Sequence, residues 1–136
     1  MMNDVNVDVI QQFRTNNGAI HSGMFKGARL LLLTTTGAKS GKLRVNPLAF
    51  TGDGDNLVVI ASKGGSPTHP DWYRNLVAHP NVTVEVGADR FEARARVAEG
   101  DERTRLFAAQ AAIMPGFAEY QRKTSRQIPV VVLERL

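Results

Sequence analysis

Residues 81–97, NVTVEVGADRFEARARV, contain two stretches in which apolar and polar residues alternate around a central GAD. Val82, Val84 and Val86 alternate with polar residues before the turn, and the stretch after Asp89 alternates in the same way. A period of two places apolar side chains on one face of a strand and polar side chains on the other. The stretch therefore predicts an antiparallel hairpin with one buried and one solvated face.

Further strands are predicted on both sides of this hairpin, each bounded by turn residues. They are Leu30–Thr36, Leu43–Thr51, Leu57–Ala61 and the apolar run Ile128–Leu133. Turns at 37–41 and 52–55 separate the first three, and a long loop follows from Ser62 to His69. The final run is apolar throughout, which predicts a central strand.

Helices are predicted before, between and after the strands. Asp4 suits the cap of a first helix that ends at Asn17-Gly18, and its apolar stripe is Val5, Val9, Ile10 and Phe13. Pro70 suits the first turn of a second helix that Pro80 ends. A third helical stretch begins at Gly100 and is broken at Pro115-Gly116. The fold class is mainly β with helices (α+β), a small antiparallel barrel with helices packed outside.

The 136 residues predict a single domain, with an N-terminal helix over 1–17 and the barrel over 18–136. There is no cysteine, which excludes disulfides and thiolate chemistry and favours a cytoplasmic location. The start of the chain carries Asp4 and Asp8, which is not typical of a signal peptide, and no apolar run reaches a membrane-spanning length. The net charge of +4 favours anionic ligands.

Several kinds of chemistry find no support in the sequence. His21, His69 and His79 lack metal-binding spacing, so no metal is predicted, and there is no G-x-S-x-G motif. Arg90, Arg94 and Arg96 could form a nucleic-acid stripe, but Glu92 interrupts it. A solvated strand face is the favoured interpretation, and nucleic acid is not expected as a partner.

Two loops could instead hold an anion. The turn Gly37-Ala38-Lys39-Ser40-Gly41-Lys42 and the segment Ser62-Lys63-Gly64-Gly65-Ser66 both combine glycine with lysine after a strand. Glycines free backbone amides to form a concave anion site, to which lysines add charge. Taken alone, the first turn is more simply an exposed hairpin turn, but two such loops in a small barrel could converge on one ligand. Trp72 and Tyr73 follow and offer planar faces, although Trp72 could equally belong to the core.

Four segments in this order closely resemble the deazaflavin (F420)-dependent nitroreductase and F420H2-dependent quinone reductase family. They are LLLTTTGAKSGKLRVNPL at 31–48, VIASKGG at 59–65, PDWYRNLVAHPNVTVEV at 70–86 and TSRQIPVVV at 124–132. The resemblance covers nearly the whole chain from Gly18 onward. It implies a split β-barrel like that of flavin mononucleotide-binding proteins and coenzyme F420, with its phosphate and polyglutamate tail, as the cofactor.

Carried over by position, the resemblance implies that the phosphate and tail contact Lys39, Ser40, Arg44 and Lys63. It implies that Asn46-Pro47, Ala61-Ser62 and Trp72 shape the slot for the deazaflavin ring. The full set of implied cofactor residues is Lys39, Ser40, Arg44, Val45, Asn46, Pro47, Leu48, Ala49, Ile60, Ala61, Ser62, Lys63, Trp72, Tyr73, Arg74 and Asn75.

The implied reaction is hydride transfer from the reduced cofactor to a quinone, nitroaromatic or activated alkene. Relatives have tyrosines along the last helical stretch, where this chain has Met114, Phe117 and Tyr120 as the implied substrate pocket. Ser62 and Tyr120 are therefore the candidate catalytic residues, which would orient the acceptor or pass it a proton.

Two alternatives remain open: a non-catalytic deazaflavin carrier, and a flavin mononucleotide-binding split-barrel oxidoreductase. The amphipathic first helix and the lipid solubility of quinones suggest peripheral contact with the inner face of the cell membrane, although Asp4 and Asp8 count against an acidic lipid surface. The sequence does not specify an oligomeric state, and a homodimer is one open alternative.

Overall fold

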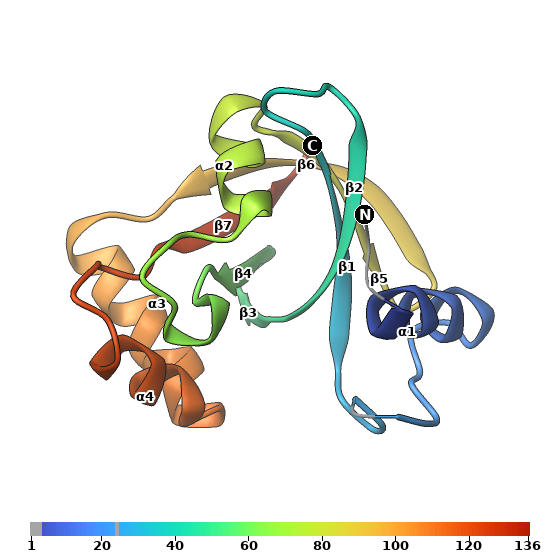
Figure 1. Cartoon of the computed structure of the whole chain (residues 1–136), viewed down its shortest axis with the longest axis horizontal. Helices are drawn as coiled ribbons and strands as arrows, with labels where there is room; N and C mark the ends of the chain where they lie inside the picture. The colour runs from blue at the N-terminus through green and yellow to red at the C-terminus, as the bar shows by residue number, and fades with distance from the viewer. Residues whose placement is uncertain (1–3, 24) are drawn as a thin grey trace.

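The computed structural model describes residues 4–23 and 25–136 and shows one curled antiparallel sheet with helices around it (Figure 1). The strands are β1 (Leu30–Thr36), β2 (Leu43–Ala49), β3 (Thr51–Asp53), β4 (Asn56–Ile60), β5 (Asn81–Val86), β6 (Asp89–Val97) and β7 (Val130–Arg135). The helices are α1 (Asp4–Thr15), α2 (Asp71–Ala78), α3 (Gly100–Ile113) and α4 (Gly116–Arg122), with a short 3₁₀ helix η1 (Lys63–Gly65). The mainly β barrel architecture predicted from the sequence is confirmed.

The seven strands follow the order β2-β1-β5-β6-β7-β4-β3. The β5–β6 hairpin lies where alternation predicted it, with Val86 opposite Asp89. Strand β7 lies between β6 and β4, so the prediction of a central final strand is confirmed. Strands β2 and β3 are the two ends of the open sheet.

The predicted strand 43–51 is confirmed over 43–49 and wrong at its last two residues. Ala49 pairs with Leu30, the first residue of β1, so β1 offers no backbone partner beyond that point. Thr51 pairs instead with Val58 of β4, at the other end of the sheet order. Phe50 lies between the two strands and is buried in the core. The chain therefore crosses at Phe50 from one end of the sheet to the other.

The concave face of the sheet holds the main core. Leu31, Leu33, Val84 and Val131 are fully buried there, and Trp72 and Leu76 of α2 pack among the same residues. Helix α2 therefore packs onto the concave side of the barrel, whereas the sequence predicted helices outside it. This placement brings the start of α2 to the mouth of the barrel.

Helix α1 covers the opposite face of β1. Val9, Ile10 and Phe13 are buried against Leu30 and Leu32. The apolar stripe that suggested membrane contact is thus used in packing, and that contact stays a prediction. Residues 1–3 and the side chains of the next two residues, including the proposed Asp4 cap, lie outside the described part of the structure.

An ion pair ties α1 to the sheet as well. Arg14 donates from Nε and Nη2 to both carboxylate oxygens of Glu85, at 3.1 and 2.8 Å. This bond raises the pKa of Arg14, against the opposing effect of burial. Within residues 4–23 and 25–136, none of the helices is long and apolar enough to cross a membrane.

Helices α3 and α4 cover the outer face near β4 and β7. Leu106 of α3 packs with Val58 and Val132, and Phe117 and Tyr120 of α4 pack against the same cluster. Arg96 donates to Glu102 of α3 at 2.6 and 2.9 Å and pairs with Glu134 at 3.2 Å. One member of the suspected arginine stripe is therefore part of an ion-pair network, while Arg90 and Arg94 are exposed.

Candidate functional site

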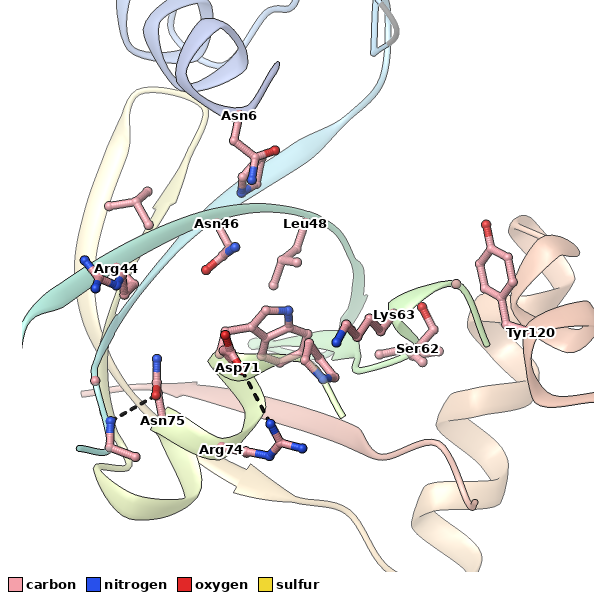
Figure 2. Close-up of a pocket in the computed structure, with 18 of the residues that line it drawn as sticks. Asn6, Arg44, Asn46, Leu48, Ser62, Lys63, Asp71, Arg74, Asn75 and Tyr120 are labelled. Atoms are coloured by element: carbon pink, nitrogen blue, oxygen red, sulfur yellow. Dashed lines mark hydrogen bonds and ion pairs between the residues drawn. The ribbon is translucent and has the colours of Figure 1, made fainter. Parts of the chain in front are cut away.

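A large cavity opens between β2, which is one end of the sheet, the end of β4 and the start of α2. Its volume is about 1090 Å³, slightly above the roughly 300–1,000 Å³ typical of small-molecule sites. Its walls come from β2, the first loop (residues 37–42), the second loop (residues 62–66) and the start of α2 (Figure 2). Helix α4 contributes the far end. The volume is sufficient for a small-molecule ligand or cofactor.

The structure brings most of the sequence-predicted site residues into this one cavity. The predicted residues that line it are Lys39, Ser40, Arg44, Val45, Asn46, Pro47, Leu48, Ile60, Ser62, Lys63, Trp72, Arg74, Asn75, Phe117 and Tyr120. Four predicted residues, Ala49, Ala61, Tyr73 and Met114, are not among the lining. The two loops that the sequence analysis paired on composition therefore face one common space.

Each of the four excluded residues has a local reason for its position. Ala49 is the last residue of β2 and packs against the cluster that contains Leu30 and Phe13. Ala61 is fully buried in the main core. The Tyr73 ring contacts the ring of His69, with centroids 4.8 Å apart. Met114 follows the last residue of α3, and its backbone N–H donates to the carbonyl of Gln110.

Sequence reasoning missed seven lining residues: Asn6, Phe25, Gly37, Ala38, Gly64, Pro70 and Asp71. Gly37, Ala38 and Gly64 belong to loops that were already suspected. Asn6 lies in α1 and Phe25 lies in the connection to β1, where no local motif pointed to a ligand. The packing of this N-terminal segment against β1 and β2 brings it beside the cavity. Figure 2 shows Asn6 at the α1 side of the site.

The cavity is strongly cationic. Lys39, Arg44, Lys63 and Arg74 line it from three separate segments, and among the described residues Asp71 is its single carboxylate. Arg74 lies 3.4 Å from Asp71, but both side chains are largely exposed, so the pair neutralises little of the charge. Convergent cations in a partly enclosed space attract an anionic ligand. Trp72 adds a planar wall and is only 6% exposed.

The first loop is a compact turn between β1 and β2. Gly37 N–H donates to the carbonyl of Lys42 at 2.8 Å, and Gly41 N–H donates to the carbonyl of Gly37 at 3.0 Å. Asn75 of α2 adds a long-range tie, because its Oδ1 accepts from Ala38 N–H at 3.0 Å. Its Nδ2 donates to the hydroxyl of Thr35 at 3.1 Å. This buried amide therefore ties the first loop, through Ala38, and the end of β1, through Thr35, to α2. Asn75 thus has a supporting role at the cavity wall.

The second loop has an unusual backbone. Lys63 adopts a φ of 48°, and Gly64 and Gly65 follow with φ of 63° and 82°. Lys63 has a β-carbon, so this left-handed conformation costs it energy that glycine does not pay. Gly65 is packed tightly on α4, since a β-carbon there would lie 2.8 Å from the carbonyl oxygen of Tyr120. The loop is therefore fixed against the helix that closes the far end of the cavity.

The far end of the cavity is aromatic. The rings of Phe117 and Tyr120 meet edge to face, with centroids 5.8 Å apart. Lys123 lies 5.9 Å from the centroid of the Tyr120 ring. Tyr120 is the aromatic residue on α4 that carries a hydroxyl, and Figure 2 shows its side chain on the same side of the site as Ser62. Ser62 itself is 8% exposed.

Residues 7–135 match the family model described as F420H(2)-dependent quinone reductase. The chain belongs to this family. An F420H(2)-dependent quinone reductase of Mycobacterium tuberculosis is 40% identical over 126 residues, which cover 90% of this chain and 85% of that protein. The resemblance inferred from the four sequence segments is confirmed.

Solved structures agree with the family assignment. An F420-H2 dependent reductase is 44% identical, with a TM-score of 0.73, and the match covers 79% of this chain and 95% of that one. A protein described as a domain-swapped dimer is 38% identical, with a TM-score of 0.75, and the match covers 94% and 96% of the two chains. This chain therefore shares its fold with both of these solved structures.

Proposed function

We propose that this protein is an F420H2-dependent quinone reductase. The observation that carries the proposal is the single cavity in which Lys39, Arg44 and Lys63 converge beside the buried ring of Trp72. A cofactor with a planar ring and a long anionic tail needs both features, cations for the tail and a flat wall for the ring. When bound and reduced, F420 supplies the hydride that the acceptor receives.

The chain's own residues hold and orient the reactants. Lys39, Ser40, Arg44 and Lys63 bind the phosphate and tail, since they lie on the two loops and on the adjoining strand. Pro47 and Trp72 border the slot for the ring system. The acceptor enters between this slot and α4, where Phe117 provides apolar surface for a quinone ring.

Ser62 and Tyr120 are the two hydroxyl groups proposed to orient the acceptor or to deliver a proton to its oxygen. Tyr120→Phe keeps the ring and removes the hydroxyl, so we expect a lower kcat with an unchanged Kd for F420. The matched control is Phe117→Leu, which alters the apolar wall and should change the KM for the quinone more than kcat. Steady-state kinetics with a panel of quinones measure both.

Calorimetric titration with oxidised F420 tests the cofactor assignment. Tight binding that Lys39→Ala weakens supports the proposal, and Lys42→Ala is the control because Lys42 lies on the same loop but is not among the lining residues. Stronger binding of flavin mononucleotide than of F420 would overturn the assignment. Binding of F420 without turnover of any quinone would indicate a carrier protein instead.

The oligomeric state is a separate proposal. The similarity to a protein described as a domain-swapped dimer supports a homodimer. Light scattering coupled to size-exclusion chromatography measures the mass directly, and a mass of 14.9 kDa, that of one chain, would contradict the proposal.

A further inference from the structure

The guanidinium of Arg126 contacts the second loop through the backbone carbonyl groups of the loop. Nη2 donates to the carbonyl of Ser62 at 2.6 Å, Nε donates to the carbonyl of Ser66 at 2.8 Å, and Nη1 donates to the carbonyl of Ala61 at 3.2 Å. Nη1 also lies 3.0 Å from Nδ1 of His69. One side chain thus binds both ends of the loop and the residue before it.

Apart from the packing of Gly65 against α4, the second loop has few other restraints on its backbone. Its internal hydrogen bonds are those from Gly65 N–H to Ser62, at 3.0 Å, and from Ser66 N–H to Lys63, at 3.1 Å. The left-handed backbone at Lys63 is strained, and the two glycines that follow have many alternative conformations. A loop of this kind keeps one shape only when its surroundings determine it. Arg126 supplies that restraint through three carbonyl oxygens.

The geometry requires an arginine. A guanidinium has five N–H donors in a planar fork, so it can donate to carbonyls at both ends of the loop at once. The donors of a lysine ammonium group are all on one nitrogen and cannot span the same distance. Arginine has no acceptor, so Nδ1 of His69 must accept and the imidazole is neutral. Burial, and then the charges of Arg126 and Arg74, lower the pKa of His69 and favour that neutral form.

Arg126 is itself held in place by α4. Nε2 of Gln121 donates to the carbonyl of Arg126 at 2.8 Å, and Oε1 of Gln121 accepts from the N–H of Ile128 at 2.9 Å. The same oxygen accepts from Arg103 of α3 at 3.0 Å. Helix α4 also carries Tyr120. The contacts from Gln121 to Arg126 and from Arg126 to the second loop therefore connect this loop to the helix at the acceptor end of the cavity.

We propose that Arg126 is a positioning residue for the cofactor site. It fixes the second loop so that Ser62, Lys63 and Gly64 line the cavity, and it places a positive charge behind them. The proposal rests on the proposed function, because it identifies the ligand of that loop as the anionic cofactor. The residue belongs to the TSRQIP segment at 124–129, which carried the family resemblance but had no assigned role.

The test compares Arg126→Lys and Arg126→Gln with Arg103→Lys. Arg103 is a matched control, since it is part-buried and donates to the carbonyl of Ile128 at 2.7 Å. Within the described part of the chain, its hydrogen bonds go to Gln121 and Ile128 and not to the second loop. We expect both Arg126 variants to raise the Kd for F420 by about tenfold or more, because a displaced binding loop loses several contacts together. The KM for the quinone should change little. Arg103→Lys should lower the melting temperature while leaving the Kd for F420 unchanged.

Hydrogen exchange of the free protein separates this proposal from the proposed function. If Arg126 holds the loop, the amides of residues 62–66 exchange faster in Arg126→Lys than in Arg103→Lys, whether or not F420 binds. Faster exchange in a protein that fails to bind F420 would support the positioning role and refute the cofactor. Unchanged exchange and unchanged F420 affinity in folded Arg126 variants would overturn the proposal. So would failure of both Arg126 variants to fold while Arg103→Lys folds, because the guanidinium would then be a requirement of the whole fold.

Discussion

The two loops that line the cavity are similar in composition but are held in different ways. The first loop joins paired strands, closes on its own backbone hydrogen bonds and receives one neutral tie from Asn75. The second loop joins a strand to a helix and depends on the charged side chain of Arg126, from a segment some sixty residues away in the chain. The first is a product of local sequence, and the second is a product of the tertiary fold.

This difference predicts how each loop responds to amino-acid substitution. Substitutions in the first loop act on an exposed turn whose strands maintain it. Substitutions at the second loop act on a strained backbone packed against α4 and Arg126. Four predictions test this contrast, beginning with the one of largest expected effect.

Replacing one glycine in each loop compares them directly. Gly65→Ala should lower the free energy of unfolding by about 2–4 kcal/mol, from the left-handed backbone together with the overlap with the Tyr120 carbonyl. Gly41→Ala should cost only about 1 kcal/mol, because Gly41 has a φ of 69° but no atom within 4 Å of the added β-carbon. Urea denaturation measures both. Equal costs would show that the second loop is no more constrained than the first.

Removing the tie to the first loop should have the next largest effect. Asn75→Ala leaves the Ala38 N–H and the Thr35 hydroxyl without their buried partner, at a cost of about 1–3 kcal/mol in unfolding free energy. We also expect weaker F420 binding in calorimetry, because the loop that carries Lys39 is released. Val77→Ala on the same helix is the control, since Val77 is 57% exposed. If Asn75→Ala matched this control in both measurements, the tie would be unimportant.

The pH dependence of stability should depend on His69. Because burial and nearby cations lower its pKa below the ordinary value of 6.5, the unfolded chain binds a proton more readily than the folded one just below that pH. The unfolding free energy should therefore fall as the pH drops below about 6.5, by this linkage. His69→Asn keeps an acceptor toward Arg126 and should reduce the slope. Denaturation midpoints between pH 5 and 7 measure it, and an unchanged slope would exclude His69 as its source.

The smallest effect is expected at the carboxylate of the cavity. Asp71→Asn removes a negative charge close to the proposed binding site of an anionic tail, so F420 affinity should rise by about twofold at low salt. The side chain is 91% exposed, and added salt should therefore abolish the gain. Calorimetry at two salt concentrations measures the change. Weaker binding by the variant would mean that Asp71 contacts the ligand directly.

Much of the fold could be predicted because its signals are local. The alternation at 81–97 specifies a hairpin, and Pro70 and Pro80 bound α2. The break between β2 and β3 could not be predicted, because it depends on long-range pairing. β2 ends where β1 begins, and Thr51 pairs with a different strand, β4. The position of α2 on the concave face depends likewise on long-range packing of Trp72.

The candidate site shows the same division. Lys39 and Lys63 could be paired from composition because each lies in a glycine-rich turn after a strand. The role of Asn75 as a tie was missed, since its partners lie in another element. Arg126 stood in a segment that was noticed for its resemblance alone. Hydrogen bonds between distant segments have no signature in a single sequence.

The order of the strands has one more consequence. Strand β2 is one end of the sheet, and β4, which leads to the second loop, lies beside the other end. The cavity is lined from both sides, by Arg44–Leu48 and by Ile60 with the loop after it. Among the described residues, β2 does not pair with β3 or β4 in the strand order. A molecule bound in the cavity would therefore contact both sides of this opening in the barrel. Ligand binding in the cavity and the stability of the barrel are therefore thermodynamically linked. We expect the barrel to be more rigid while the ligand is bound and less rigid after each release.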